Sequence, residues 1–277
     1  MCPSAETVEL PELKTNVLPS NGQLVAEETD ALLKASLAAV RADLAETPAW
    51  SGAPTPTDDF LLMFLRAEVF KPALAAKRYR KFWEMKVFLW GEDKAGLPVK
   101  AEDATPALHR ECFQLIPDGR DIEGRQVLFV DPGNTDQSLD RKQRLRAMWY
   151  VILAGLEDVE TQRRGLCFIV CQKTVTSAQM DRSFLKMGIS SIQGALPVRV
   201  GSINICYPAT FFRIVWAIIS IVMHKRVKKR VRVIPGTDAQ VAEALGYIVD
   251  AKHLPPPMGA KTTDFPGWLE ERMKAES

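Results

Sequence analysis

Three patterns of apolar and polar residues follow one another between Leu196 and Pro235. Val200–Tyr207 is rich in β-branched and apolar residues and ends at a proline, which predicts a buried strand. Phe211–Met223 is apolar on nearly every side and predicts a helix. Lys225–Arg232 then carries six cations and two valines. A strand, an apolar helix and a cationic segment in this order indicate a protein that handles an apolar molecule beside an anionic one.

The apolar helix is too short to cross a membrane. A membrane-spanning helix needs about 20 consecutive apolar residues, and Ile214–Met223 supplies about half of them between Arg213 and His224. A helix that is apolar on all sides must still be covered by something. Other parts of the protein, a membrane surface or a bound lipid could cover it, and periodicity alone does not choose among them.

The cationic segment has two possible interpretations. Val227 and Val231 lie four residues apart and share a helix face, so the cations between and beside them project outward. Such a cluster is either an ordinary solvated face or a binding surface for phosphate groups. The neighbouring apolar helix favours lipid phosphates, because nucleic-acid surfaces usually interleave aromatic or base-reading polar residues among their cations.

The N-terminal third of the chain has a helical pattern. Residues 1–22 are polar and aperiodic, which predicts a flexible tail. Leu24–Leu44 has leucines at helical spacing, Thr57 precedes a helix with two acids in its first turn, and another helix begins at Pro72. We therefore predict a helical domain over residues 23–100.

From about residue 106 the pattern alternates between strands and helices. Apolar runs without alternation predict buried strands, separated by helices, which is typical of a mainly parallel sheet covered on both faces. We predict an α/β domain over residues 101–262, with Pro255–Pro257 ending the packed body and an amphipathic tail over 263–277. The predicted strands are Arg125–Asp131, Gly165–Cys171, Val200–Tyr207 and Val231–Ile234, and the helices are Ser138–Thr161, Ala178–Gln193 and Thr237–Asp250.

Composition excludes several classes of function. The 36 Lys and Arg residues nearly balance the 34 Asp and Glu residues, so the net charge of +2 does not suggest a general nucleic-acid binder. Five irregularly spaced cysteines do not form a disulfide framework, and no secretory signal is visible, so we expect a cytoplasmic protein. The three histidines lie in separate segments, and no nucleophile elbow or phosphate-binding glycine loop occurs. We expect no enzyme, no catalytic residue and no metal site.

Several stretches together resemble the CRAL-TRIO lipid-binding and lipid-transfer family, which includes phosphatidylinositol transfer proteins and carriers of alpha-tocopherol and retinaldehyde. They are D-D-F-L-L-M-F-L-R-A-E-V-F-K-P-A-L-A-A from Asp58 to Ala76, G-R-Q-V-L-F-V-D-P-G-N from Gly124 to Asn134, the stretch Ile203–Phe211, and L-P-P-P-M-G from Leu254 to Gly259. The resemblance covers about residues 57–260 and rests on the order and spacing of these stretches.

The resemblance implies a single lipid held in a cavity between the sheet and a mobile gating helix, which would be Phe211–Met223. It implies a phospholipid, sterol, tocopherol or retinoid as ligand, no other cofactor, an anionic and possibly phosphoinositide-containing membrane surface as partner, no nucleic acid, and a monomer with peripheral membrane association. The expected lipid-binding residues are Phe129, Phe168, Val170, Ile203, Ile205, Phe211, Phe212, Val215, Trp216 and Ile219. The expected membrane or phosphoinositide contacts are Arg199, Arg226, Lys228, Lys229 and Arg230.

The chain departs from the family pattern at several positions. Ser220 and Ile221 stand where many phosphatidylinositol-binding members have Lys-Pro, and Met63 and Glu68 replace arginines. A buried phosphate needs a charged or hydrogen-bonding partner, so these departures weaken the case for buried phosphatidylinositol. Two alternatives to lipid transfer stay open: a lipid sensor or adaptor that does not exchange its lipid, and a basic-patch scaffold for protein or nucleic acid without lipid.

Overall fold

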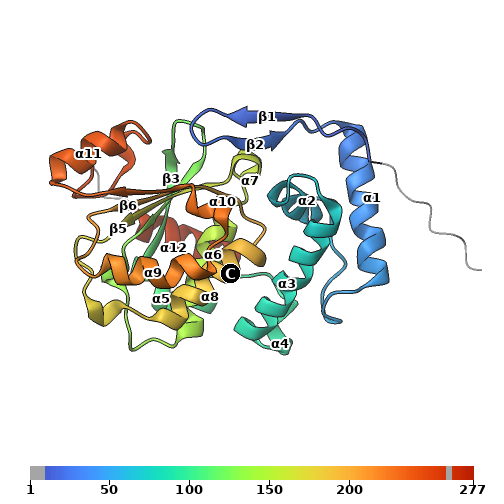
Figure 1. Ribbon diagram of the computed structural model, residues 1–277. Coiled ribbons are helices and arrows are strands. Elements are labelled where there is room, and N and C mark those ends of the chain that lie inside the picture. The colour runs from blue at the N-terminus through green and yellow to red at the C-terminus, as the bar shows by residue number, and fades with distance from the viewer. Residues whose placement is uncertain (1–9, 260–263) are drawn as a thin grey trace, which may run out of the picture.

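A central sheet with helices on both faces forms most of the molecule, and a helical unit lies at one side of it (Figure 1). The computed structural model describes residues 10–259 and 264–277. The predicted class, a mixed α/β fold with a mainly parallel sheet, is confirmed.

The sheet has the strand order β3-β4-β5-β6-β7, in which β3 is antiparallel to β4 and the other neighbours are parallel. The four predicted strands are present, and β3 is an additional strand. Its sequence contains Pro117-Asp118-Gly119, which is typical of a turn and hides the strand from pattern analysis. The bounds are β3 Phe113–Arg120, β4 Gln126–Val130, β5 Leu166–Cys171, β6 Val200–Cys206 and β7 Val231–Ile234.

Helices α6 (Arg141–Gly155), α8 (Arg182–Gly194) and α9 (Phe212–Val222) lie on one face of the sheet, and α11 (Asp238–Gly246) lies on the other. The single helix predicted over Ser138–Thr161 is in fact α6 followed by α7 (Val159–Arg164). A new helix begins there because the Asp158 side chain accepts hydrogen bonds from the backbone N–H groups of Glu160 and Thr161 in the first turn of α7. Short helical turns are α10 Lys225–Lys228, α4 Glu92–Ala95, α5 Thr105–Leu108, η1 Ala101–Ala104, η2 Pro132–Asn134, η3 Ser177–Gln179 and η4 Ala251–His253.

The helical unit contains α1 (Asp30–Glu46), α2 (Asp58–Ala67) and α3 (Pro72–Trp90). Thr57 caps α2 as predicted, since its hydroxyl accepts the Phe60 backbone N–H. Aromatic side chains of α2 and α3 pack edge to face with one another, and Phe82 of α3 also lies against Trp149 of α6. One apolar core therefore joins the helical unit to the α/β part.

An N-terminal hairpin begins within the predicted flexible tail, at Thr15. Strands β1 (Thr15–Leu18) and β2 (Gln23–Ala26) pair antiparallel, so α1 begins at Asp30 and not at Leu24. Residues 1–9 lie outside the described residues. Each strand has only four residues, the lower limit of the alternation that identifies a strand, so the pattern along the sequence does not reveal them.

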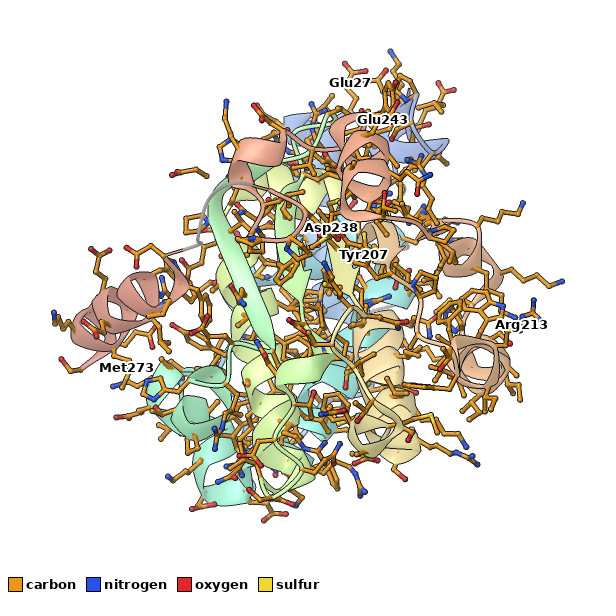
Figure 2. All side chains as sticks on the ribbon, turned by 90° about the vertical axis from the view of Figure 1, so that its left-hand side faces the viewer. Glu27, Tyr207, Arg213, Asp238, Glu243 and Met273 are labelled. Carbon is orange, nitrogen blue, oxygen red and sulfur yellow. The ribbon has the colours of Figure 1, made fainter. Side chains whose placement is uncertain are left out.

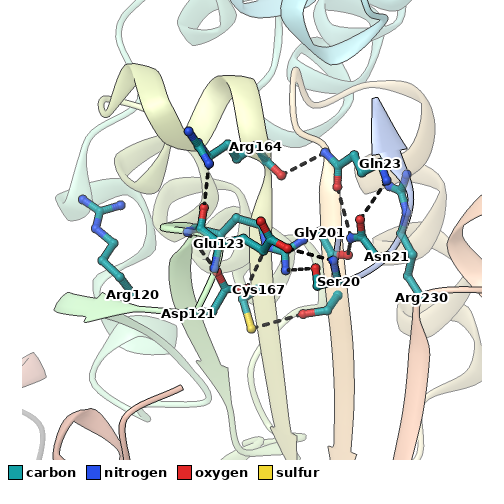
Figure 3. A network of polar contacts seen from close by, with 12 residues as sticks. Ser20, Asn21, Gln23, Arg120, Asp121, Glu123, Arg164, Cys167, Gly201 and Arg230 are labelled. Atoms are coloured by element: carbon teal, nitrogen blue, oxygen red, sulfur yellow. Dashed lines mark hydrogen bonds and ion pairs between the residues drawn. The ribbon is translucent and has the colours of Figure 1, made fainter. Parts of the chain in front are cut away.

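Hydrogen bonds from the hairpin turn hold it to the sheet (Figure 3). The Ser20 backbone N–H donates to Glu123 at 2.8 Å, and the Asn21 side chain donates to the Gly201 carbonyl at 2.6 Å. Beneath them the buried Arg125 guanidinium pairs with Asp121 at 2.7 Å and also donates to the Ser20 hydroxyl. The hairpin is therefore part of the folded body.

The C-terminal helix α12 (Phe265–Glu276) also packs into the body, so the prediction that Pro255–Pro257 ends it is wrong. Phe265 and Leu269 of α12 are fully buried in the same core as α6. Glu276 accepts hydrogen bonds from the Tyr150 hydroxyl and from the Ala101 backbone N–H. The tail predicted over 263–277 is thus a docked helix from Phe265 onward.

Candidate functional site

An apolar cavity of about 230 Å³ lies between the sheet and helices α6, α8 and α9. Side chains of alternate strand residues project to the same face, and these form the cavity floor. Phe168 and Val170 of β5 and Ile203 and Ile205 of β6, which were predicted to bind lipid, all line this cavity. Leu128 and Val130 of β4 complete this surface.

Phe129 does not line the cavity, and its predicted position there is wrong. It lies between Leu128 and Val130 on β4, so its side chain projects to the opposite face. There it is buried in the separate apolar cluster that α11 covers. The sequence of β4 is apolar on both faces, so it did not reveal which residues face the cavity.

Helix α9 covers the cavity. Phe212, Val215, Trp216 and Ile219 line it. Phe211 does not line the cavity and packs instead against a small apolar cluster formed by Val215, Ile219 and Met223. The buried residues of α9 belong to a small cluster that is distinct from the main core. This helix is therefore attached to the molecule by less apolar contact than the sheet or α6.

The outer face of α9 is also largely apolar. Ile221 is 84% exposed and Ile214 is 55% exposed. Arg213 lies on the same outer side, away from the sheet (Figure 2). No helix of the described residues is long and apolar enough to cross a bilayer.

Helix α8 forms a wall of the cavity that the sequence analysis did not assign. Leu185, Ile189 and Ile192 line it. Their spacing of four and three residues places them on one helix face, and this spacing was the available signal. Gly188 on the same face comes close to the Met148 side chain of α6.

The polar groups of the cavity are few. Among the described residues that line it, the charged one is Asp181, whose carboxylate pairs with Arg144 at 2.9 Å and with Arg141 at 3.0 Å. Partial burial raises the pKa of Asp181, but hydrogen bonds from Phe184 N–H and from both arginines outweigh it and lower the pKa to about 2. Among the residues that the structure describes, no cation lines this cavity.

A second, larger cavity of about 710 Å³ is strongly cationic. It lies between α3 of the helical unit and the segment that follows α9, and its lining includes Arg226 and Arg230 as well as Lys77, Arg78 and Lys81 of α3. The α3 cations were not predicted, although Lys77 and Lys81 are four residues apart on one helix face. Glu68 also lines this cavity and pairs with Arg78 at 2.6 Å.

The five predicted membrane-contact cations occupy different environments. Arg226 and Lys229 are exposed, Lys228 is half-buried, and neither lysine lines the cationic cavity. Arg230 is half-buried and donates to the Val200 carbonyl. Burial, with Arg125 and Arg226 nearby, lowers the pKa of Arg230.

Arg199 is buried, although it lines the cationic cavity. Its guanidinium donates to the Arg163 carbonyl at 2.6 Å and to the Leu24 carbonyl of the hairpin. Burial, together with nearby Arg230, lowers its pKa to about 10. These contacts hold the Arg199 side chain in the protein interior, whereas Arg226 is exposed.

The segment between β6 and α9 begins with a constrained residue. Tyr207 has a φ of +52°, a value unusual for a residue with a side chain. Lys173 at the end of β5 lies 5.2 Å from the Tyr207 ring and pairs with Asp238 at 2.7 Å. The Tyr207 and Asp238 side chains lie close together (Figure 2). The Tyr207 backbone N–H also donates to the Ile234 carbonyl and the Ala209 N–H to the Gln172 side chain, each at 3.1 Å, so the segment that leads into α9 is attached to the sheet.

The two cavities adjoin, with an apolar one under α9 and a cationic one beyond its C-terminal end. Comparison with known families gives this arrangement a context: the family model of the CRAL/TRIO domain matches residues 111–259, more than half of the chain. The chain belongs to the CRAL/TRIO domain family. Membership supports a lipid-binding or lipid-transfer function in general, and members are generally not enzymes.

Similarities to individual proteins are more distant. Tyrosine-protein phosphatase non-receptor type 9 of Mus musculus and of Homo sapiens is 28% identical over 92 residues, which is 32% of this chain and 15% of those proteins. The crystal structure of Sfh5 superposes with a TM-score of 0.55 at 14% identity, over 90% of this chain and 96% of that chain. The Sfh5 similarity extends the shared fold beyond the CRAL/TRIO domain into the helical unit.

Proposed function

We propose that this protein encloses one apolar lipid beneath α9 and exchanges or presents it at anionic membranes. The observation that carries the proposal is the adjacency of the two cavities, which share the wall residues Ile192, Gln193, Val200 and Val227. One cavity suits a hydrocarbon chain and the other suits phosphate groups.

Burial accounts for lipid binding without a reactive group. Each CH₂ group transferred from water to an apolar interior contributes about 0.8 kcal/mol. The floor and the α8 and α9 walls are almost entirely apolar. A phosphate inside this cavity would lack a cation, because the charged residue among the described lining residues is Asp181, which is negative. An anionic group of a lipid therefore belongs in the cationic cavity or in the membrane surface.

The outer face of α9 and the cations beyond it suit a membrane surface. Ile214 and Ile221 would enter the boundary between headgroups and acyl chains, as apolar residues of interfacial helices do. Each cation near an anionic bilayer contributes about 1 kcal/mol. The protein would then associate peripherally, with α9 facing the bilayer that takes up or supplies the lipid.

Native mass spectrometry of the purified protein with lipid extraction tests lipid binding. One bound lipid per chain is expected. A protein that stays free of lipid after incubation with mixed liposomes would contradict the proposal and favour a scaffold role.

Vesicle binding tests the membrane contact with matched charge changes. Replacing exposed Arg226 and Lys229 with Ala should weaken binding to anionic vesicles by about 30-fold at low salt and reduce the salt dependence. Lys34→Ala with Lys94→Ala removes the same charge from exposed positions on α1 and α4 and should change binding little. Equal losses in both variants would remove the specific role of the α10 region. A protein that binds both lipid and vesicles but never exchanges its lipid would be a sensor.

A further inference from the structure

Gln193 lies where the apolar cavity, the cationic cavity and the end of α9 meet. It is the penultimate residue of α8, is 8% exposed, and lines both cavities. Its side chain has no assigned role in the lipid-binding arrangement described above. Its position makes it the part of the shared wall that is joined by hydrogen bonds to α9.

Both ends of the Gln193 amide hold the C-terminal end of α9. The side-chain nitrogen donates to the carbonyl of Val222, the last residue of the helix, at 3.1 Å. The side-chain oxygen accepts the backbone N–H of His224 at 2.5 Å. One side chain therefore satisfies backbone groups on both sides of the helix end, where such groups otherwise lack partners.

The α8 side of this contact is anchored by the helical unit. Arg78 of α3 donates to the backbone carbonyls of Gln193 at 2.8 Å and Leu196 at 2.6 Å, and it pairs with Glu68. A cation on the last carbonyls of a helix is a favourable arrangement. Among the described residues, the small apolar cluster and the Gln193 contacts hold the C-terminal end of α9, so this end of α9 is the partner free to move.

The residues next to the contact carry the charge that a membrane attracts. Lys225 and Arg226 directly follow His224, and both line the cationic cavity. Anionic headgroups that draw these cations outward would pull the His224 N–H away from Gln193. Loss of that contact would release the end of α9 and open the apolar cavity toward the membrane.

We infer that Gln193 is a positioning residue that latches α9 closed and links membrane charge to lipid release. This inference rests on the proposed function. It predicts that opening begins at the C-terminal end of α9, beside the cationic cavity, while the Tyr207 end stays attached. It also predicts that removing the latch makes release less dependent on anionic lipid.

The test measures how fast protein loaded with Nile red, an uncharged apolar dye, releases it to two kinds of vesicle. One kind is pure phosphatidylcholine and the other also contains phosphatidylserine. In the wild type, release to the anionic vesicles should be the faster. Gln193→Leu removes both side-chain hydrogen bonds to the end of α9 and should raise release to the neutral vesicles about 10-fold, so that the ratio of the two rates falls.

Two further variants make the test specific. Gln193→Glu keeps the acceptor for His224 and loses the donor to Val222, so an intermediate ratio is expected; it carries the test if thermal unfolding shows that Gln193→Leu is not folded. Gln240→Leu alters a glutamine of α11, on the other face of the sheet, whose side-chain oxygen accepts the Thr237 backbone N–H of its own first turn, and should leave the ratio unchanged.

The outcomes separate the two proposals. A wild type that binds neither Nile red nor pyrene-labelled phosphatidylcholine would overturn the proposed function itself. A wild type that releases dye faster to anionic vesicles, with the same ratio in folded Gln193 variants, would overturn only the latch. Slower release from Gln193→Leu to neutral vesicles would also overturn it.

Discussion

The Glu28 carboxylate accepts two hydrogen bonds from the guanidinium of Arg163, which lies 135 residues further along the chain, each at 2.9 Å. Arg66 of α2 binds the same carboxylate at 2.8 Å and also donates to Gln162. Glu28 precedes α1, whereas Arg163 lies in α7 beside the sheet. This ion-pair cluster therefore joins the helical unit to the CRAL/TRIO domain.

Glu28 makes this junction sensitive to acid. Burial raises the pKa of Glu28, but hydrogen bonds and charge from Arg66 and Arg163 together outweigh burial and lower the pKa from 4.5 to about 2. Because the folded-state pKa is depressed, the stabilisation is present above pH 4.5 and is lost as pH falls toward 2. We expect Glu28→Gln to lower the free energy of unfolding by about 3 kcal/mol at pH 7. Urea denaturation should show the difference from wild type shrinking between pH 5 and pH 2, and a difference independent of pH would contradict this role.

The inner face of α9 should control lipid loading. Trp216 lines the apolar cavity and is partly buried, whereas its neighbour Ala217 is exposed. Trp216→Asp would place a carboxylate in an apolar site, so we expect loss of Nile red binding with the fold retained. Ala217→Asp adds the same charge to the outer face and should bind the dye normally. Delivery of the dye from cyclodextrin separates cavity binding from membrane contact, and normal loading of Trp216→Asp would show that the cavity is misplaced.

Arg199 and Arg226 should respond differently to the same substitution. Arg199 is buried and joins the hairpin to α7, whereas Arg226 is exposed. Arg199→Met leaves the Arg163 and Leu24 carbonyls without this donor and should lower the melting temperature, while affinity for anionic vesicles stays close to that of the wild type. Arg226→Met should lower the affinity for anionic vesicles and leave the melting temperature close to that of the wild type. A large loss of vesicle affinity in Arg199→Met, measured on folded protein, would restore the membrane role that the sequence predicted for this residue.

The C-terminal helix should contribute to global stability. Leu269 of α12 is fully buried in the main core, and its neighbour Glu270 is exposed. Leu269→Ala should lower the free energy of unfolding by about 2–4 kcal/mol because it leaves a cavity. Glu270→Ala should change it by less than about 0.5 kcal/mol. Equal stability of the two variants in thermal unfolding would show that α12 is not part of the core.

Local patterns identified the elements but not which way their side chains face. Four of the five sheet strands, the helix that covers the cavity and the cap at Thr57 were predictable, because each depends on residues that are neighbours in the sequence. Phe129 was assigned to the wrong face because β4 is apolar on both sides, and only the helices packed against it distinguish them. Arg199 was assigned to the membrane because a buried arginine and an exposed one look alike in sequence.

The sequence by itself determined that an apolar helix is followed by a cationic segment, since this order is a property of consecutive residues. Tertiary structure decided which residues lie against this helix and this segment. Lys77 and Lys81 of α3 enter the cationic cavity, and Arg78 anchors α8, because the helical unit packs against the α/β domain. Gln193 reaches Val222 and His224 because α8 and α9 lie side by side. These contacts join residues that are about 30 to more than 100 positions apart, and hydrogen bonds over such separations depend on packing geometry that no local pattern encodes.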